Sequence, residues 1–272
     1  RLSLGMQAYQ PHLLGLLGRI HDFPQVAESV RLAREACLDN ISLDLMFGLP
    51  GQTVADWSET LEAALSLSPR HLSCYGLIPE GGTPLKDDLD AGLLSLPEEE
   101  AERAMYDHAL VTLAQHGFRQ YEISNFALPG YVCRHNLGYW RQVPYLGLGA
   151  AASSMLPGCK AGCAYVRRTN PAGLDAYMAM VHRGTWETRT QETISPAEAQ
   201  FETMMLGLRT TEGVSEEGFL RMHGVSLVTR YGARLSRLAS SGLLAHDDGW
   251  WRLTRRGMDV QNAVLVELMD DG

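Results

Sequence analysis

The sequence has little that would suit a membrane protein or a secreted one. No stretch approaches the roughly 18 to 20 uninterrupted apolar residues of a membrane-spanning helix, and the first residues lack the basic and then apolar order of a secretory signal. Only five cysteines occur among the 272 residues, an odd and sparse set that excludes a secreted disulfide framework. We therefore expect a soluble, cytoplasmic protein with reduced thiols.

Basic residues are scarce as well. The chain has 23 lysines and arginines against 32 acidic residues, which gives a formal net charge of -9. This balance opposes a broad, charge-driven attraction to nucleic acid or to an anionic membrane, and leaves the specific binding of a small molecule open. Hydrophobic residues make up 45% of the chain, enough for one large domain or two modest ones.

Hydrophobic spacing in the first 125 residues alternates between the period of a strand and that of a helix. This alternation is typical of βα units built around a parallel sheet. Strands are predicted over residues 2–7, 41–47, 71–77 and 118–124, with crossover helices around 26–37, 54–65 and 101–113. Residues 78–96 and 126–165 have no clear period, so we expect long irregular connections there, of the kind that compact domains keep for function.

After about Thr190 the pattern indicates a small helical domain. Residues 195–198 have the spacing of a capping box, further helices are predicted after Ser215 and around 228–239, and Asp248-Gly249 joins two strands before a last helix to about 268. Three helices and a hairpin predict a winged helix, a fold that often binds DNA. Residues 193–272 contain eight arginines, no lysine and eleven acidic residues, however, and this charge favours a structural or lid role over DNA binding.

Polar side chains stand at the carboxyl ends of the predicted strands, where α/β sheets and barrels place their ligands. Asp44 lies inside an apolar run, so its carboxylate needs either a structural partner or a ligand hydroxyl. Gln7 ends the preceding strand. Arg19 follows it on a loop, where its guanidinium is either ordinary surface charge or a clamp for a ligand carboxylate.

The densest group of chemically capable residues is the segment Cys133 to Trp140. His135 offers a nitrogen ligand of the kind that heme iron accepts, and Tyr139 and Trp140 offer flat faces for a macrocycle. A buried, hydrogen-bonded histidine is the alternative that composition alone favours. Cys159 and Cys163 form a close pair of thiols, but neither a third cysteine nor a histidine stands nearby in the sequence to complete a metal site.

Five segments resemble a known family and occur in its order: residues 1–7, 14–21, 44–53, 121–127 and 135–140. Together they resemble the oxygen-independent coproporphyrinogen III oxidase family of radical SAM proteins, over nearly the whole chain. Because of the H-N-x-x-Y-W element at residues 135–140, the chain resembles the heme chaperones of this family more than its true oxidases.

This resemblance implies an α/β fold, the second half of a radical SAM (βα)6 partial barrel followed by a winged-helix-like domain. The barrel portion with its extension would cover residues 1–165, a connecting segment 166–192 and the helical domain 193–272. S-adenosylmethionine (SAM) binds across the barrel mouth in the family. Gln7, Arg19 and Asp44 match positions that contact its ribose and carboxylate, and Ile78 and Ala152 match positions that line the adenosine.

The resemblance also makes His135 the leading candidate for a ligand of heme iron. Tyr139 and Trp140 would pack against the macrocycle, and Cys133 is the competing iron donor. The family's [4Fe-4S] cluster is held by a C-x3-C-x2-C motif that the 272 residues lack, so we expect its ligands upstream of Arg1, which resembles the start of the fourth barrel strand.

We therefore expect the carboxyl-terminal portion of a heme chaperone that delivers heme to an acceptor hemoprotein. No nucleic-acid partner is expected, and a homodimer is compatible with the sequence. The alternative is an oxygen-independent coproporphyrinogen III oxidase, in which a 5'-deoxyadenosyl radical would start the decarboxylation of two propionates.

Overall fold

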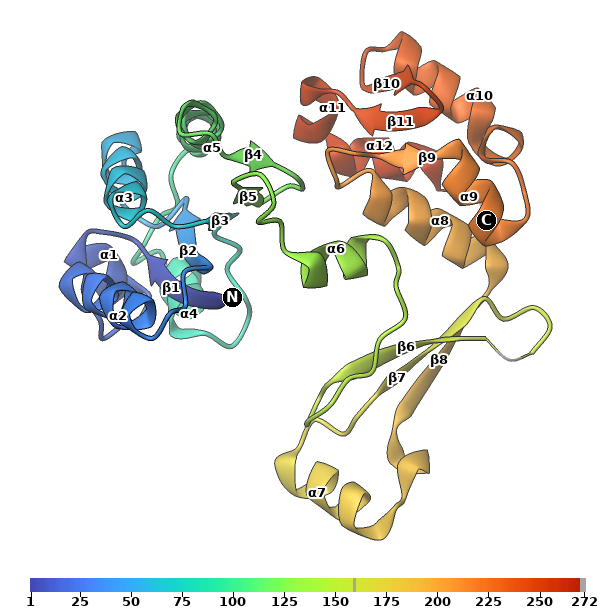
Figure 1. Cartoon of the computed structure of the whole chain (residues 1–272), viewed down its shortest axis with the longest axis horizontal. Coiled ribbons are helices and arrows are strands. Elements are labelled where there is room, and N and C mark those ends of the chain that lie inside the picture. The colour runs from blue at the N-terminus through green and yellow to red at the C-terminus, as the bar shows by residue number, and fades with distance from the viewer. Residues whose placement is uncertain (159, 270–272) are drawn as a thin grey trace. The chain divides into compact units, whose positions relative to one another are not determined.

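In the computed structural model, which describes residues 1–158 and 160–269, the chain divides into two units, Arg1–Val132 and Cys133–Gly272 (Figure 1). Cys159 lies outside the described residues, so the expectation that the Cys159 and Cys163 thiols form no metal site stays a prediction. Within the described residues, no helix is long and apolar enough to cross a membrane.

A five-stranded sheet in the order β1-β2-β3-β5-β4 forms the amino-terminal unit. The first three strands are parallel, and β5 runs antiparallel to both of its neighbours. Its strands are β1 (Leu2–Gln7), β2 (Ile41–Phe47), β3 (His71–Gly76), β4 (Arg119–Gln120) and β5 (Asn125–Ala127). Its helices are α1 (Pro11–Leu16), α2 (Phe23–Glu35), α3 (Val54–Ser66), α4 (Pro84–Asp90) and α5 (Glu99–Gln115).

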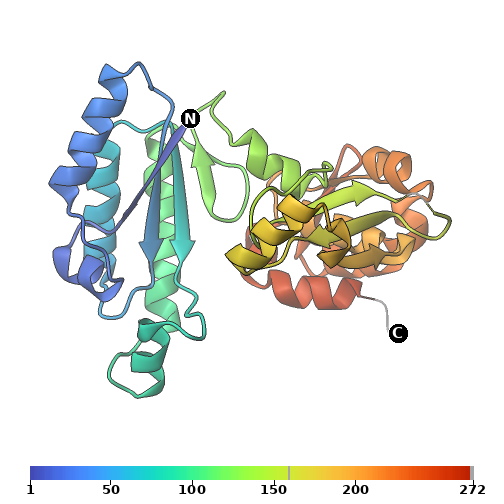
Figure 2. The same cartoon turned by 90° about the horizontal axis from the view of Figure 1, so that it is seen from below.

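Helices α2, α3 and α5 run alongside the strands (Figure 2) and bury their apolar faces against one face of the sheet. Helices α2 and α3 begin at capping boxes, which Asp22 and Thr53 form with Gln25 and Asp56. The core between helices and sheet contains Trp57, whose indole N–H donates to the carbonyl of Met105 at 2.8 Å. The hydrophobic period therefore predicted the crossover units correctly.

The strand expected over residues 118–124 is wrong in its extent. Only Arg119 and Gln120 pair as β4, and the chain then turns back into β5, which lies between β4 and β3. The Glu122 carboxylate accepts the backbone N–H of Ser124 at 3.1 Å and so favours this turn. The connections expected to be irregular also contain regular elements, since α4 lies within 78–96.

The carboxyl-terminal unit begins with α6 (Arg134–Trp140), a short helix where an irregular segment was expected. A three-stranded antiparallel sheet follows, in the order β6-β7-β8. It comprises β6 (Ser153–Pro157), β7 (Tyr165–Thr169) and β8 (Thr190–Ile194), with α7 (Leu174–Arg183) and the 3₁₀ helix η1 (Trp186–Thr188) between β7 and β8. Residues 166–192, expected to be a connecting segment, thus contain most of β7, the start of β8 and the helices α7 and η1 between them. The expected domain boundaries remain a prediction.

The remaining elements form the predicted winged helix. These elements are α8 (Pro196–Gly207), β9 (Val214–Ser215), α9 (Glu216–His223), α10 (Leu227–Ser240), β10 (Leu244–Asp247), β11 (Trp250–Leu253), α11 (Arg255–Asp259) and α12 (Gln261–Leu268). Ser195 caps α8 through a capping box with Glu198, and Asp248 and Gly249 both have positive φ in the two-residue turn between β10 and β11. The helices and β11 share one apolar core around Phe219, Tyr231 and Leu235.

Candidate functional site

The sheet of the amino-terminal unit has one apolar face and one polar face. Ile41, Leu43, Leu45 and Phe47 of β2 lie in the core with the helices. Successive side chains of a strand point to opposite faces, so the residues between them belong to the other face. Strand register places Gly5, Asp44, Ser73 and Asn125 in one row across β1, β2, β3 and β5. This polar row is the face on which a ligand would find hydrogen-bond partners.

Asp44 is the charged member of this row. Its carboxylate is half-buried and accepts the Ser3 hydroxyl at 3.2 and 3.1 Å through its two oxygens. Burial, and then the charge of Asp44, raise the pKa of the Cys74 thiol on the neighbouring strand, so that the thiol stays protonated. One weak hydroxyl donor leaves most of the acceptor capacity of the Asp44 carboxylate available to a ligand.

Gln7 lies close to Asp44 because β1 ends in an unusual way. The strand register shifts between Gly5 and Gln7, and Gln7 has a φ of 63°, a left-handed value that side-chain-bearing residues rarely adopt. A Cβ on Gly5 would stand 2.9 Å from Gln7 Nε2, so the amide of Gln7 lies over Gly5, the register partner of Asp44. The structure therefore brings an amide and a carboxylate together on the polar face.

Arg19 and Ile78 lie on the connections that follow β1 and β3. The His21 ring contacts the carbonyl oxygen of Met6 at 3.2 Å, which holds the loop with Arg19 beside the end of β1. Arg19 is exposed, and its guanidinium makes no hydrogen bond or ion pair with the rest of the described chain. Ile78 follows β3 and is 81% exposed. Ala152 belongs to the carboxyl-terminal unit, where its carbonyl accepts the N–H of Asn170.

In the carboxyl-terminal unit, the helical conformation of α6 brings His135 and Tyr139 together. The two residues are four positions apart and therefore share a helix face. Their rings meet edge to face with centroids 4.8 Å apart, and Tyr139 meets Tyr145 in the same way, also at 4.8 Å. His135 and Tyr139 are both exposed, which makes His135–Tyr139–Tyr145 an accessible aromatic ladder. The alternative of a buried, hydrogen-bonded histidine does not describe this side chain.

Trp140 and Cys133 lie apart from this ladder. Trp140 lines a cleft of 340 Å³ with Phe219, Met222 and Trp250, whereas His135 and Tyr139 do not line it. Cys133 is the N-cap residue of α6, although its side chain does not cap the helix. The structure thus keeps the four predicted heme residues on one short helix and its cap, but divides them between different faces.

Sequence reasoning missed two polar networks of the amino-terminal unit. Ser42 Oγ and Tyr121 Oη each lie 2.8 Å from a ring nitrogen of the buried His71. Burial, and the charge of Arg1, lower the pKa of His71 to about 4, so this histidine is neutral. Glu122 is buried and accepts the side-chain N–H of Asn125. In the sequence, Glu122 and Asn125 stand close to the end of a predicted strand, and this position was the signal that could have indicated the second network.

Most arginines of the winged helix are engaged in contacts within the unit. Arg237 pairs with Glu267, and Arg255 pairs with Asp259. The Arg252 side chain donates to the carbonyl of Glu212 at 3.2 Å. These contacts agree with the low basic charge of this domain and give no support to DNA binding. Within the described ranges, no group of three or more histidine, cysteine or acidic side chains could hold a metal ion.

Comparison with known proteins connects this geometry to a family. The family model "HemN C-terminal domain" matches residues 194–260. The heme chaperone HemW of Bacillus subtilis (strain 168) is 38% identical over 271 residues, which are 97% of this chain and 68% of that protein. The heme chaperone HemW of Synechocystis is 40% identical over 215 residues, which are 79% of this chain and 51% of that protein.

Among solved structures, coproporphyrinogen III oxidase (HemN) from Escherichia coli, described as a radical SAM enzyme, matches with a TM-score of 0.75. The match covers 98% of this chain and 63% of that one, at 18% identity. This likeness confirms the predicted fold class and shows the fold alone. The chain spans about half of the Synechocystis relative and less than two thirds of the solved structure.

Proposed function

This chain belongs to the heme chaperone HemW family of radical SAM proteins, and from that premise we propose that it binds heme at α6 for delivery to an acceptor hemoprotein. The observation that carries the proposal is the accessible ladder His135–Tyr139–Tyr145. Heme needs a lone-pair donor for its iron and flat partners for its apolar faces. An exposed imidazole beside two tyrosine rings supplies both on one surface.

Within this proposal, His135 is the iron ligand and Tyr139 packs against the macrocycle. Cys133, two residues away, is the competing donor, because a thiolate also binds heme iron. Trp140 contributes from the cleft on another side of α6, either to the macrocycle or to the anchoring of the helix. The neutral imidazole is the form that binds iron, and the exposure of His135 keeps its ring nitrogens accessible.

We further propose that the polar face of the amino-terminal sheet contributes to a SAM site. The Asp44 carboxylate can accept two ribose hydroxyls, the Gln7 amide lies beside it, and the Arg19 guanidinium can clamp the carboxylate of SAM. Ile78 would line the adenosine. The residues fit SAM, but a [4Fe-4S] cluster would take its ligands from outside these 272 residues, which contain no C-x3-C-x2-C.

A hemin titration followed by Soret absorbance tests the heme proposal. His135→Ala should remove the donor and weaken hemin affinity at least tenfold, with a changed spectrum, because an axial ligand and part of the aromatic ladder are lost together. Cys133→Ala should stay close to the wild type. If Cys133→Ala changes the spectrum and His135→Ala does not, the thiolate is the ligand and the assignment of His135 is wrong.

His116→Ala is the matched control for this titration. His116 is also exposed, but it lies at the end of α5, where its ring contacts the carbonyl of Thr112. The same substitution there should leave the hemin spectrum and affinity unchanged. A loss equal to that of His135→Ala would mean that hemin binds surface histidines without a specific site. Turnover of coproporphyrinogen III by a cluster-loaded protein would instead support an oxidase.

Asp44→Ala tests the SAM site separately. In a protein that also carries the cluster ligands, loss of this carboxylate should weaken SAM binding about tenfold or more, the value of one or two charge-assisted hydrogen bonds. Hemin affinity should stay unchanged, since α6 belongs to the other unit. Calorimetric titrations of both ligands measure the two effects. Equal losses of both affinities would make Asp44 a structural residue.

A further inference from the structure

Strand β7 carries two consecutive arginines, Arg167 and Arg168, with very different surroundings. Because side chains alternate along a strand, the two guanidinium groups point to opposite faces of the β6-β7-β8 sheet. Arg167 stands opposite Glu192 on β8, and Arg168 stands opposite Gln191. The pair therefore offers an internal comparison between an arginine with acidic partners and one without them.

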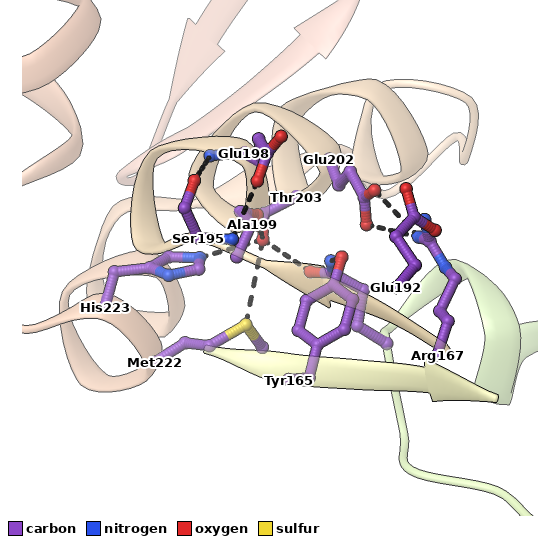
Figure 3. A network of polar contacts seen from close by, with 11 residues as sticks. Tyr165, Arg167, Glu192, Ser195, Glu198, Ala199, Glu202, Thr203, Met222 and His223 are labelled. Atoms are coloured by element: carbon purple, nitrogen blue, oxygen red, sulfur yellow. Dashed lines mark hydrogen bonds and ion pairs between the residues drawn. The ribbon is translucent and has the colours of Figure 1, made fainter. Parts of the chain in front are cut away.

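Arg167 is fully partnered by carboxylates. Figure 3 shows its guanidinium directed toward Glu192 and Glu202. One of its terminal nitrogens lies 2.7 Å from both oxygens of Glu202, and the other lies 3.4 Å from Glu192. Its charge is thus neutralised within the fold, as is usual for a partly buried arginine.

Arg168 and Arg189 share the other face, where Glu187 lines the same cavity but forms an ion pair with neither arginine within the described residues. Arg189 precedes β8 and lies two positions from Gln191, which puts it on the same side as Arg168. The two side chains line one cavity of 420 Å³ together with Trp186, Glu187 and Gln191. Neither arginine forms an ion pair within the described part of the chain.

The existing contacts leave most of the donors of these two arginines unused. Arg168 Nε donates to the side-chain oxygen of Gln191 at 3.0 Å. The guanidinium carbon of Arg189 lies 4.6 Å from the centre of the Trp186 ring, and Arg189 Nε is buried without a hydrogen-bond partner. A buried donor that makes no hydrogen bond destabilises the fold. Diagonal neighbours on paired strands lie about 7–8 Å apart, so the two positive charges also repel each other.

From this geometry we propose that Arg168 and Arg189 form a binding site for a small oxyanion, a carboxylate or a phosphate. Such an anion would accept hydrogen bonds from both guanidinium groups and would remove their mutual repulsion. Trp186 holds the Arg189 guanidinium by a cation–π contact and so fixes its orientation before the anion arrives. The site shares no residue with the α6 ladder or with the polar face of the amino-terminal sheet, so it does not depend on the proposed function.

Inorganic phosphate is the probe for a direct test at constant ionic strength. Binding should be saturable and should change the fluorescence of Trp186, a change that disappears in Trp186→Phe while calorimetry still detects binding. Arg168→Gln and Arg189→Gln should each weaken phosphate at least tenfold. Arg183→Gln, the matched control, removes an exposed arginine on α7 that does not line the cavity, and should have no effect.

Glu187 provides a variant with the opposite expected sign. Its carboxylate lines the cavity and repels an anion, so Glu187→Gln should tighten phosphate binding severalfold. This variant keeps the test decisive even if the arginine variants lose their fold, which circular dichroism would show. Parallel titration with succinate distinguishes a carboxylate from a phosphate, and saturable binding of either supports the site. Binding that is equal in chloride, or that Glu187→Gln leaves unchanged, would overturn the proposal.

Discussion

Glu122 is a buried acid whose ionisation is tied to the fold. It is 2% exposed, and burial raises the pKa of its carboxyl, while hydrogen bonds from Asn125 and Ser124 act in the opposite direction. Folding therefore favours the protonated form. The stability that this group contributes is fully present below the ordinary pKa of 4.5 and is lost as the pH rises through the raised value in the folded state.

We expect Glu122→Gln to raise the melting temperature at about pH 8 and to leave it unchanged at about pH 4. Glutamine has the shape of the protonated acid and keeps an acceptor for the Ser124 N–H. Once the Asn125 amide turns over, the glutamine NH2 group donates to Asn125 Oδ1, which is otherwise buried without a partner. Each kcal/mol gained corresponds to roughly 2–4 °C. Thermal unfolding followed by circular dichroism at the two pH values measures the effect.

Glu122→Ala is the contrasting variant. It removes the acceptor for both Ser124 and Asn125, so it should destabilise the protein at both pH values, by about 1–3 kcal/mol. If Glu122→Gln lowers the melting temperature at high pH, the folded protein requires the ionised carboxylate, and the raised pKa is wrong.

The sequence indicated that Asp44 is a functional candidate but gave no such indication for Glu122, and the reason is physical. Asp44 interrupts a largely apolar strand, and an acid in such a run is visible without any structure. Glu122 stands in the turn between β4 and β5, and its burial depends on the pairing of β5 with β3, a strand that comes much earlier in the chain. Tertiary context of this kind leaves little trace in local spacing.

Among the elements, α6 matters most for the proposed heme site. The spacing of His135 and Tyr139 gives a ring contact only while the helical turn between them persists. Gly138 lies within that turn, and a Cβ there would meet nothing within 4 Å. The element therefore offers two substitutions at one position, with opposite effects on the helix.

Gly138→Ala should stabilise α6 by about 0.5–1 kcal/mol and keep or strengthen hemin binding. Gly138→Pro should break the turn at a cost of about 3 kcal/mol and weaken hemin binding toward that of His135→Ala. Hemin titration of both variants gives the comparison. Equal affinity in the two variants would show that the H-N-x-x-Y-W segment binds heme without its helical conformation.

Long elements with caps were predictable and short ones were not. The capping boxes at Asp22, Thr53 and Ser195 mark helices whose apolar period spans several turns. α6 has only seven residues, a glycine and no side-chain cap, so its helical signal is weak. β8, Thr-Gln-Glu-Thr-Ile, buries only its last residue and pairs through its neighbours rather than through a hydrophobic alternation of its own.

For the whole molecule, two separate cores explain why the fold class was predictable. One core lies between the sheet and helices α2, α3 and α5, and the other lies within the winged helix. The elements around each core have their own hydrophobic period, so the hydrophobic pattern of the sequence changes where the winged helix begins. The division at Val132 was not expected, because the segment from α6 to β8 has few buried apolar residues to announce a unit.

The two faces of β7 also have a consequence for how that strand is aligned. A slip of one residue against β8 would turn every β7 side chain to the opposite face. Arg167 would then leave Glu192 and Glu202, and Tyr165 would leave its buried position beside Ile194. Strand β7 has few apolar residues. The ion pairs of Arg167 therefore fix its alignment against β8, as hydrophobic side chains do in most other strands.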